Sequence, residues 1–297
     1  MALWSLKRDI CPVFDRFRRF LPFLKSKGGP VVPVVRLQGP IGMGTPLRPG
    51  LSLSAVAQPL EKAFAMKRAP AVALIVNSPG GSPVQSRLIF QRIRDLAAEY
   101  QKDVLVFVED VAASGGYMIA VAGDEIFVDP SSIIGSIGVV AAGFGFKDLI
   151  AKIGVERRVY TAGEKKVILD PFQDENPEDV EYLKSLQLDI HEIFIELVKS
   201  RRGDVLSDNP DLFTGKFWTG RAARDLGLAD SIGDLRGILR SRYGEKCQPR
   251  LVTMPRGLFG RRTGVGGSDA GLAPRGGLAE DVISALESRA MWMRYGL

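Results

Sequence analysis

Two loops rich in serine and glycine contain the residues of this chain that are best suited to chemistry. Each of these loops follows a run of apolar residues. Residues 71–77 (AVALIVN) lead into residues 78–82 (SPGGS), and residues 104–109 (VLVFVE) precede residues 112–116 (AASGG). Continuous apolar runs of this kind are typical of strands buried on both faces of a parallel sheet. Sites in α/β proteins form at the carboxyl ends of such strands. The sequence therefore predicts one site built from both loops.

Ser114 has the setting of a nucleophile. It stands between alanine and glycine where a helix is expected to begin, so its hydroxyl is exposed. The backbone amide of Gly115 can face a developing oxyanion. A second amide, from Gly80 or Gly81, would complete an oxyanion hole, because glycine lets the backbone approach closely. The alternative interpretation is that both loops are tight turns that use glycine for its positive φ.

A serine nucleophile needs a general base, and the sequence offers two kinds. The one histidine, His191, falls in the middle of an expected helix, beside its apolar stripe. A lysine can replace histidine when burial lowers the pKa of its ammonium group, as in serine–lysine variants of the catalytic triad. Lys165 and Lys166 lie in residues 161–172 (TAGEKKVILDPF), between a glycine turn and an apolar run. Chemistry alone does not choose between these two lysines.

The elements that must position these loops alternate along the chain. A body of strands and helices over residues 30–243 predicts an α/β fold with a mainly parallel sheet and flanking helices. Strands are expected at residues 31–37, 71–77, 104–109, 125–129 and 157–161, and helices at residues 51–67, from after 82 to about 100, from after 116 to about 123, and at 177–202.

Composition excludes several classes of protein. One histidine and two cysteines among 297 residues rule out a disulfide scaffold and a Cys/His zinc site. The glycine-rich loops of nucleotide-binding proteins are absent, so we expect no cofactor and no metal. Residues 1–29 and 244–297 carry net charges of +5 and +3, which leaves −2 on residues 30–243 of the total +6. A slightly acidic body argues against nucleic acid as a partner.

The two ends of the chain, residues 1–29 and 244–297, differ in composition from the body between them. Residues 1–29 combine an apolar stripe with basic residues, which suits an anionic membrane surface or a loose basic tail. The longest uncharged apolar stretch, residues 133–146, is too short to span a membrane, and arginines interrupt any signal-like region. We therefore expect a cytoplasmic protein with a peripheral membrane contact through residues 1–28. Residues 244–277 are expected to be a Gly/Arg-rich linker, and residues 278–297 a C-terminal helix.

Five separated motifs together resemble peptidase family S49, which includes the signal peptide peptidase A and SohB proteins. The motifs are SPGGS at residues 78–82, AASGGYMIA at 112–120, GSIGVV at 135–140, TAGEKK followed by DPF at 161–172, and stretches within 190–230. They occur in the family's order over about residues 31–240. The resemblance implies a ClpP/crotonase-like fold and a serine endopeptidase with a lysine base.

The same resemblance implies a role for individual residues. Ser114 matches the family's nucleophile, Lys166 its general base, and the amides of Gly81 and Gly115 its oxyanion hole. Ser136 is a further candidate, because its hydroxyl can accept a hydrogen bond from a neutral lysine and orient it; otherwise it is a turn serine. The sequence departs from the family at Lys165. The choice between Lys165 and Lys166 as the general base therefore stays open. We also expect this chain to carry neither the N-terminal membrane anchor nor the signal that many relatives carry.

The predicted function is cleavage of apolar peptides, such as remnant signal peptides or membrane-protein fragments, by a Ser114–Lys166 dyad. The resemblance also implies a homo-oligomer in which a neighbouring subunit can supply the lysine. Three alternatives stay open. One is a hydrolase that pairs Ser114 with His191. Another is a crotonase-type acyl-CoA enzyme that uses the same glycine amides for a thioester oxyanion, and the third is a non-catalytic oligomeric scaffold.

Overall fold

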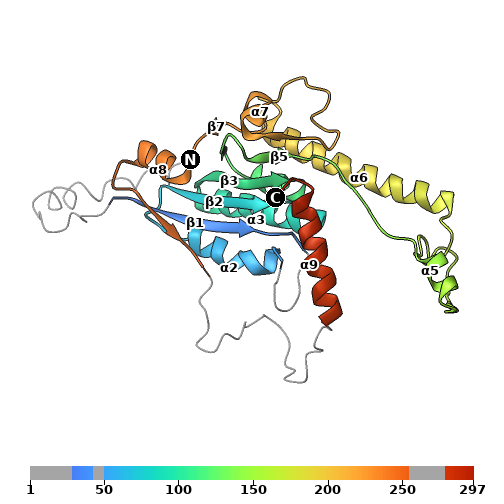
Figure 1. Ribbon diagram of the computed structural model, residues 1–297. Helices are drawn as coiled ribbons and strands as arrows, with labels where there is room; N and C mark the ends of the chain where they lie inside the picture. Colours follow the sequence, from blue (N-terminus) through green and yellow to red (C-terminus); the bar gives the residue numbers. More distant parts are fainter. Residues whose placement is uncertain (1–28, 43–49, 254–277) are drawn as a thin grey trace, which may run out of the picture.

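The computed structural model describes residues 29–42, 50–253 and 278–297 of the chain (Figure 1). The basic segment 1–28 and most of the expected linker, residues 254–277, lie outside these ranges, so the predictions made for them stay predictions. Within the described ranges, no helix is long and apolar enough to cross a membrane.

The described residues form one eight-stranded sheet. Its path is β6-β5-β3-β2-β1-β8, and β4 joins it by pairing with both β3 and β7. Every pairing is parallel except that of β5 with β6. The predicted α/β class with a mainly parallel sheet is confirmed. The strands are β1 (Val31–Gln38), β2 (Ala71–Ser78), β3 (Asp103–Ala113), β4 (Glu125–Val128), β5 (Ile133–Gly135), β6 (Phe217–Thr219), β7 (Ser231–Ile232) and β8 (Gln248–Leu251).

Four of the described helices, α3, α6, α7 and α8, begin at a residue whose side chain accepts a hydrogen bond from a backbone amide of the first turn. The Ser82 side chain accepts a hydrogen bond from the Gln85 amide at the start of α3, and Asn176 caps α6 in the same way. A proline follows each of these two caps, in the first turn, where no amide donor is needed. The helices are α2 (Leu53–Phe64), α3 (Pro83–Tyr100), α4 (Gly115–Ala120), α5 (Lys147–Lys152), α6 (Pro177–Arg202), α7 (Gly220–Asp225), α8 (Leu235–Tyr243) and α9 (Leu278–Met293).

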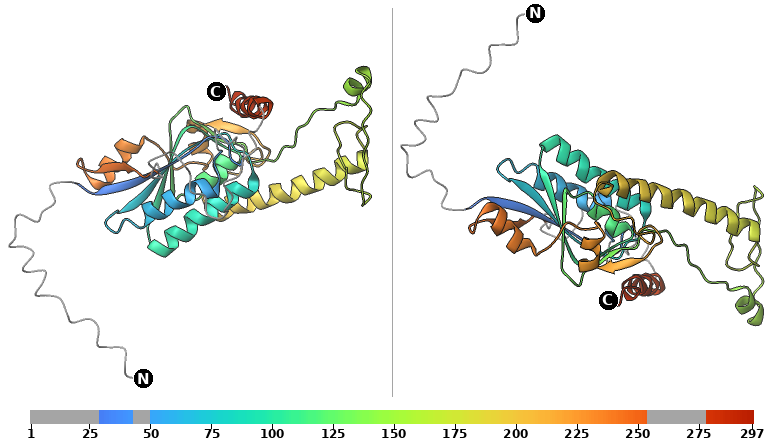
Figure 2. Two further views of the ribbon diagram at one scale, coloured as in Figure 1. Left: turned by 90° about the horizontal axis from the view of Figure 1, so that it is seen from below. Right: turned by 90° about the horizontal axis from the view of Figure 1, so that it is seen from above.

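Helices cover both faces of the central strands (Figure 2). The even-numbered residues of β2 pack with α2, α3 and α4 in the larger apolar cluster, whereas its odd-numbered residues pack with Leu239 of α8 and the free thiol of Cys247. Successive side chains of a strand point to opposite faces of a sheet. A continuous apolar run such as β2 is therefore buried on both sides, as the sequence predicts.

Strand β3 changes its outer neighbour partway along. Residues 105–108 pair with β4, and residues 111–113 pair with β5. Against β2, the register moves from Val76 opposite Val108 to Ser78 opposite Ala112, so β3 contains a bulge of two extra residues. An even number of extra residues preserves which face each side chain points to. The bulge therefore redirects the end of β3 without exposing its apolar residues.

Helix α6 leaves the body of the molecule and carries a long extension (Figures 1 and 2). Its buried residues, Phe194, Val198 and Arg202, all belong to its C-terminal part. We call residues 140–193 the arm: it comprises the chain around α5 and the N-terminal part of α6. At 1.5 Å per residue, the 26 residues of α6 span about 39 Å. The far end of the arm therefore lies well away from the sheet.

The predicted strand at residues 157–161 is wrong. These residues lie in the arm and have no regular secondary structure. Tyr160 is 90% exposed, although the run of valine, tyrosine and threonine at residues 159–161 is of the kind that favours strands. A strand is stable only when a neighbouring strand pairs with its backbone groups, and the arm offers none within the described chain.

Strand β8 lies inside residues 244–277, where the sequence predicts a linker. It extends the sheet beyond residue 243 by pairing with β1 in parallel. Pro249 lies within this strand, and proline in a sequence argues against a strand. An edge strand nevertheless tolerates proline, because one side of its backbone is unpaired.

Arg202 anchors the base of the arm. It is 6% exposed, and its guanidinium donates to both carboxylate oxygens of Asp230 (2.8 and 3.0 Å) and to the Gly227 carbonyl. Asp230 also accepts a hydrogen bond from the Ile126 amide of β4 (2.7 Å). The pair therefore joins the end of α6 to the sheet and to the segment after α7.

Replacing Arg202 with alanine is expected to lower the free energy of unfolding by about 3 kcal/mol. Breaking a buried ion pair usually has an effect of about 3–5 kcal/mol, and the lower end applies because Asp230 retains some contact with water. Urea unfolding measures this change. The matched control is Arg224→Ala, which removes an exposed pair with Asp225 and is expected to change stability by about 1 kcal/mol or less. Equal effects of the two substitutions would contradict the anchoring role.

Candidate active site

Ser114 occupies a strained turn between β3 and α4. Its φ of +52° and ψ of −125° are rare for a residue with a side chain, and such geometry is found where the surrounding structure imposes it. The Ser114 amide donates to the Gly135 carbonyl (2.8 Å), and its carbonyl accepts from the Met118 amide (3.0 Å). The hydroxyl forms no hydrogen bond within the described residues. A sharp strand-to-helix turn of this kind presents a serine hydroxyl for attack.

Helix α4 is fixed behind this turn by a buried aromatic residue. The Tyr117 hydroxyl donates to the Leu228 carbonyl (2.9 Å), and the side chain is completely buried. Burial raises the pKa of the Tyr117 phenol, so the group stays protonated and keeps its role as a donor. The first turn of α4 is therefore held in one position next to Ser114.

The glycine loop after β2 lies directly against this turn. A Cβ on Gly80 would lie 2.8 Å from the Cβ of Ser114 and 3.1 Å from the amide nitrogen of Gly115. A Cβ on Gly81 would lie 2.2 Å from the carbonyl oxygen of Ile41. Both glycines also have positive φ, +105° and +138°. Only glycine fits at these two positions, because the backbones touch and the conformation is strained for other residues.

Two backbone amides, one in the glycine loop and one in the Ser114 turn, remain as donors without an acceptor among the described residues. Ile41 bonds to the residues on either side of Gly81, accepting from the Ser82 amide and donating to the Gly80 carbonyl (2.8 Å each). The amide of Gly81 itself donates to no acceptor within residues 29–42, 50–253 and 278–297. The amide of Gly115 is the first of a helix and has no intrahelical acceptor. Such a pair of amides can stabilise an oxyanion.

Asn77 is a positioning residue that sequence reasoning missed. It is almost fully buried and fills the bulge in β3: its amide nitrogen donates to the Asp110 carboxylate (2.7 Å), and its oxygen accepts from the Val111 amide (3.3 Å). The next residue, Ser78, donates to the Gly39 carbonyl (2.7 Å). The available signal was the pair of polar residues that ends the apolar run of β2.

Ser136 lies next to the same turn. It is buried, has a φ of +53°, and follows Gly135, whose carbonyl accepts the Ser114 amide. Its own amide donates to the Lys216 carbonyl (2.7 Å). The structure therefore brings Ser114, Ser136 and the glycine loop together, as the motif order suggested.

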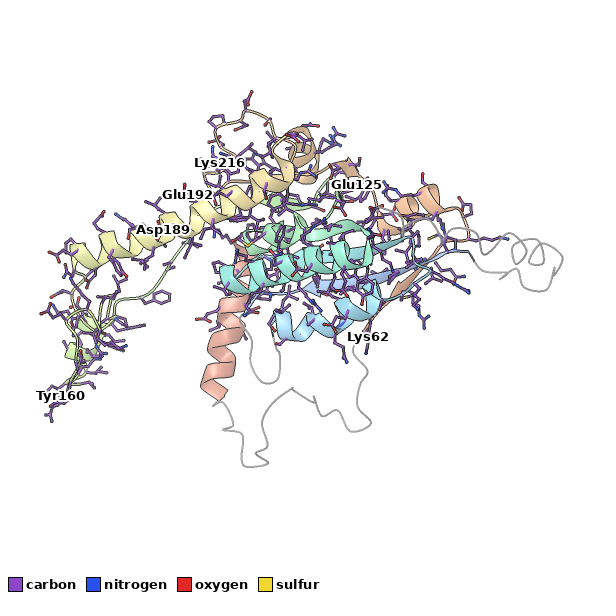
Figure 3. All side chains as sticks on the ribbon, turned by 180° about the vertical axis from the view of Figure 1, so that it is seen from behind. Lys62, Glu125, Tyr160, Asp189, Glu192 and Lys216 are labelled. Atoms are coloured by element: carbon purple, nitrogen blue, oxygen red, sulfur yellow. The ribbon has the colours of Figure 1, made fainter. Side chains whose placement is uncertain are left out.

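The two candidate lysines lie elsewhere, in the arm between α5 and α6. Figure 3 shows the labelled Tyr160, from the same segment, at the outermost point of the molecule. Lys166 is exposed, and the folded chain does not bring it to Ser114. Lys165 points to Glu178 (3.3 Å) and Asp179 (3.6 Å). The hydrogen bond and the charge of Glu178 raise the pKa of Lys165, so this ammonium stays protonated and is unsuited to act as a base.

The single histidine, His191, forms its hydrogen bond away from Ser114. The Nε2 atom of His191 lies 3.0 Å from the Ile137 carbonyl oxygen and not at the Ser114 hydroxyl. This bond links α6 to the loop that follows Ser136. Among the described residues, no group of three His, Cys, Asp or Glu side chains could hold a metal ion.

Comparisons with known proteins show which family this chain resembles. Residues 97–244 match the model of peptidase family S49. A protein of Brucella abortus (strain 2308) named "Na(+)/H(+) antiporter NhaA" is 60% identical over 271 residues, which are 90% of this chain and 37% of that protein. "Protease 4" of Haemophilus influenzae is 32% identical over 208 residues, 68% of this chain and 32% of that protein. "Serine protease SPPA, chloroplastic" of Arabidopsis thaliana is 30% identical over 206 residues, 68% of this chain and 29% of that protein.

The chain spans 37% of the length of the Brucella proteins, so the antiporter name describes a much longer protein. The match to the family model covers Ser114, Ser136 and Lys166. The glycine loop of residues 78–82 precedes that match but lies against Ser114 in the fold. From the sheet, the ordered motifs and these similarities, we conclude that the chain belongs to peptidase family S49 and has the ClpP/crotonase-like fold of that family.

Proposed function

We propose that this chain is a serine endopeptidase in which Ser114 is the nucleophile and Lys166 the general base. The observation that carries the proposal is the turn at Ser114. A serine in a strained conformation adjoins the Gly115 amide and touches the loop that contains Gly81, and neither of these two amides has an acceptor of its own among the described residues. This combination suits acyl transfer. The name of the Arabidopsis relative supports the serine type.

The chemistry follows the order of proton transfers that such a dyad allows. Neutral Lys166 takes the proton of the Ser114 hydroxyl while Oγ attacks the peptide carbonyl carbon. The amides of Gly81 and Gly115 hold the resulting oxyanion. Lys166 then gives the proton to the leaving amine as the C–N bond breaks. A water molecule loses a proton to Lys166 and attacks the acyl-enzyme. Ser114 regains that proton when the acid product leaves.

A second copy of the chain is proposed to supply Lys166. The base must reach the Ser114 hydroxyl, and the arm of the same chain holds Lys166 far from it. The arm also exposes an unusual number of large apolar side chains, which marks an interaction surface. They include Val140, Phe144, Leu149, Ile153, Val155, Tyr160, Tyr182, Leu186 and Leu188. An arm that meets the site of the next copy makes a head-to-tail contact, and such contacts form a ring when the rotation between copies closes.

The substrates are proposed to be extended apolar peptides, such as remnant signal peptides or fragments of membrane proteins. The basic residues of segment 1–28 are proposed to hold the enzyme near an anionic membrane surface, where such peptides are found. The histidine alternative has less support, because the His191 ring bonds to the Ile137 carbonyl.

Substituting the dyad residues tests the assignment. Ser114→Ala and Lys166→Ala are each expected to reduce peptide hydrolysis by about a thousandfold or more, because the residues of such a unit act together. Hydrolysis of a fluorogenic peptide and labelling by a fluorophosphonate both report the reaction.

The matched controls for this test are Lys165→Ala and His191→Ala, which are expected to keep most of the activity. An inactive Lys165→Ala protein beside an active Lys166→Ala protein would mean that the base is misplaced by one residue. Loss of activity in a folded His191→Ala protein would favour a serine–histidine hydrolase.

The pH dependence of kcat/KM provides a separate test. A lysine base is active only when neutral, so kcat/KM is expected to rise with pH and to remain high on the alkaline side. Lys165 contributes nothing to this rise, because Glu178 raises the pKa of that ammonium group. A rate profile measured with the folded protein is decisive. A steady fall from about pH 7 to about pH 9 is incompatible with a lysine base.

A further inference from the structure

The chain around Lys166 is held on both sides by a buried charge. We call residues 159–169 the lysine loop. Asp170, which follows this loop, has a side chain that is only 3% exposed, and it forms an ion pair with Arg157, which precedes the loop. The other oxygen of the Asp170 carboxylate accepts a hydrogen bond from the Phe172 amide (3.0 Å). The ion pair therefore joins the two ends of the lysine loop.

Aromatic contacts fix the same ion pair in place. The Arg157 guanidinium lies over the Phe172 ring, 5.0 Å from its centroid, which is an attractive cation–π arrangement. The Phe172 ring packs on the ring of Phe146, with 5.6 Å between the centroids. The Phe146 amide also donates to the Pro171 carbonyl (2.6 Å). The base of the lysine loop is therefore attached to the residue at which α5 begins.

Leu169, the last residue of the lysine loop, has a strained backbone. Its φ is +54°, a left-handed conformation that is rare for a large side chain and persists only where the surroundings impose it. Leu169 adjoins Asp170, whose carboxylate is engaged on both oxygens. Within the loop, the Lys166 amide donates to the carbonyl of Gly163 (3.2 Å) and closes a turn. The lysine loop therefore has one defined conformation, with Lys166 at its turn.

A second ion pair reaches the lysine loop but is weaker. Lys165 lies 3.3 Å from Glu178 of α6, and both side chains are more than half exposed (64% and 80%). Exposed ion pairs contribute little to stability, whereas breaking a buried pair leaves an uncompensated charge. The order of the lysine loop therefore depends mainly on Arg157 and Asp170.

We propose that Arg157 and Asp170 are positioning residues of the peptidase reaction, which hold the lysine loop in the conformation that delivers Lys166 to the Ser114 hydroxyl. The inference rests on the proposed function, because it takes Lys166 as the general base. A general base must lie within hydrogen-bond reach of the proton that it takes. A displacement of about 1 Å can lower the rate about a hundredfold. Neither Arg157 nor Asp170 transfers a proton, so both act through Lys166.

The first experiment compares full-length variants in steady-state hydrolysis of a fluorogenic peptide. Arg157→Ala and Asp170→Asn are each expected to lower kcat about a hundredfold and to change KM less than about twofold, because the base is displaced while the substrate contacts remain. The double variant is expected to be no slower than either single variant, because both substitutions remove the same ion pair. Arg157→Lys keeps the charge opposite Asp170 and is expected to recover about tenfold of the loss.

The matched controls for this experiment remove exposed ion pairs next to the buried one. Arg158→Ala breaks a pair with Glu156 in which both side chains are mostly exposed (68% and 73%). Asp174→Asn breaks a pair with Lys147 at the surface of the arm. Both controls are expected to keep the kcat of the unmodified chain, because exposed pairs do little to order the chain around them.

The second experiment measures the order of the lysine loop without catalysis. A protease that cleaves after lysine acts on Lys165 and Lys166 only when the surrounding chain opens locally. Arg157→Ala is expected to speed this cleavage about tenfold, as followed by mass spectrometry, whereas Arg158→Ala is expected to leave its rate unchanged. Equal cleavage rates in the two variants would overturn the inference.

The third experiment uses mixed assemblies to show which half of the site the ion pair serves. An Arg157→Ala chain retains Ser114, and a Ser114→Ala chain retains an intact lysine loop. Mixing these two chains is expected to restore as much activity as mixing Ser114→Ala with Lys166→Ala chains. Mixing Arg157→Ala with Lys166→Ala chains is expected to restore none. A general loss of folding in the Arg157→Ala chain would instead leave both of its mixtures inactive.

The outcomes separate this inference from the proposed function. If the Lys166→Ala protein stays active, the proposed function fails, and the cleavage rates alone support or overturn the ordering of the lysine loop by the ion pair. If Lys166→Ala is inactive while Arg157→Ala and Asp170→Asn match the controls in kcat, the proposed function stands and this inference is overturned. Recovery of activity with Lys166→Ala chains would also overturn it, because the defect would then lie in the half of the site that contains Ser114.

Discussion

The backbone contact between the glycine loop and the Ser114 turn is the constraint on which the site depends. Gly80 and Gly81 have no room for a Cβ, because Ser114, Gly115 and Ile41 lie directly against them. The serine itself is held at positive φ, a conformation that persists only when its surroundings impose it. The buried strands β2 and β3 supply that rigidity, since both loops are continuations of these strands.

The sheet also determines the direction in which each loop leaves. The two-residue bulge in β3 turns the strand toward β5 while its apolar residues stay on their original faces. Asn77 satisfies the backbone amide of Val111 that the bulge leaves without a strand partner, which prevents a buried unpaired donor. The Ser114 amide can then bond to the Gly135 carbonyl, which connects the proposed nucleophile to the loop that contains Ser136.

In the proposed mechanism a single chain is incomplete, because its arm holds Lys166 away from Ser114. Its anchor is strong: Arg202 and Asp230 fix the end of α6, and His191 adds a bond to the Ile137 carbonyl. The rest of the arm exposes apolar side chains and carries Lys166 away from the sheet. In the proposed assembly, the same contact that covers these side chains delivers the base and removes it from water, as a neutral lysine requires.

The sequence predicted most of the sheet and the loop that holds the proposed nucleophile, because continuous apolar runs and glycine-flanked loops are local signals. The runs at β2 and β3 indicated buried strands, and Ser114 and Gly115 followed from the loop after β3. Local signals failed at residues 157–161, where residue types that favour strands belong to an exposed arm, and at β8, an edge strand that contains Pro249. Neither the burial of Tyr295 nor the role of Asn77 could be inferred, because both depend on contacts between distant segments.

Mixing two inactive chains tests the central claim, a site shared between copies, most directly. Ser114→Ala and Lys166→Ala proteins are allowed to exchange subunits in equal amounts, and peptide hydrolysis is then measured. If the arm of one copy serves the serine of the next, random assembly restores about one quarter of the unmodified activity. If the mixture stays inactive after mass spectrometry has established that mixed oligomers are present, Lys166 does not act on the serine of a neighbouring chain.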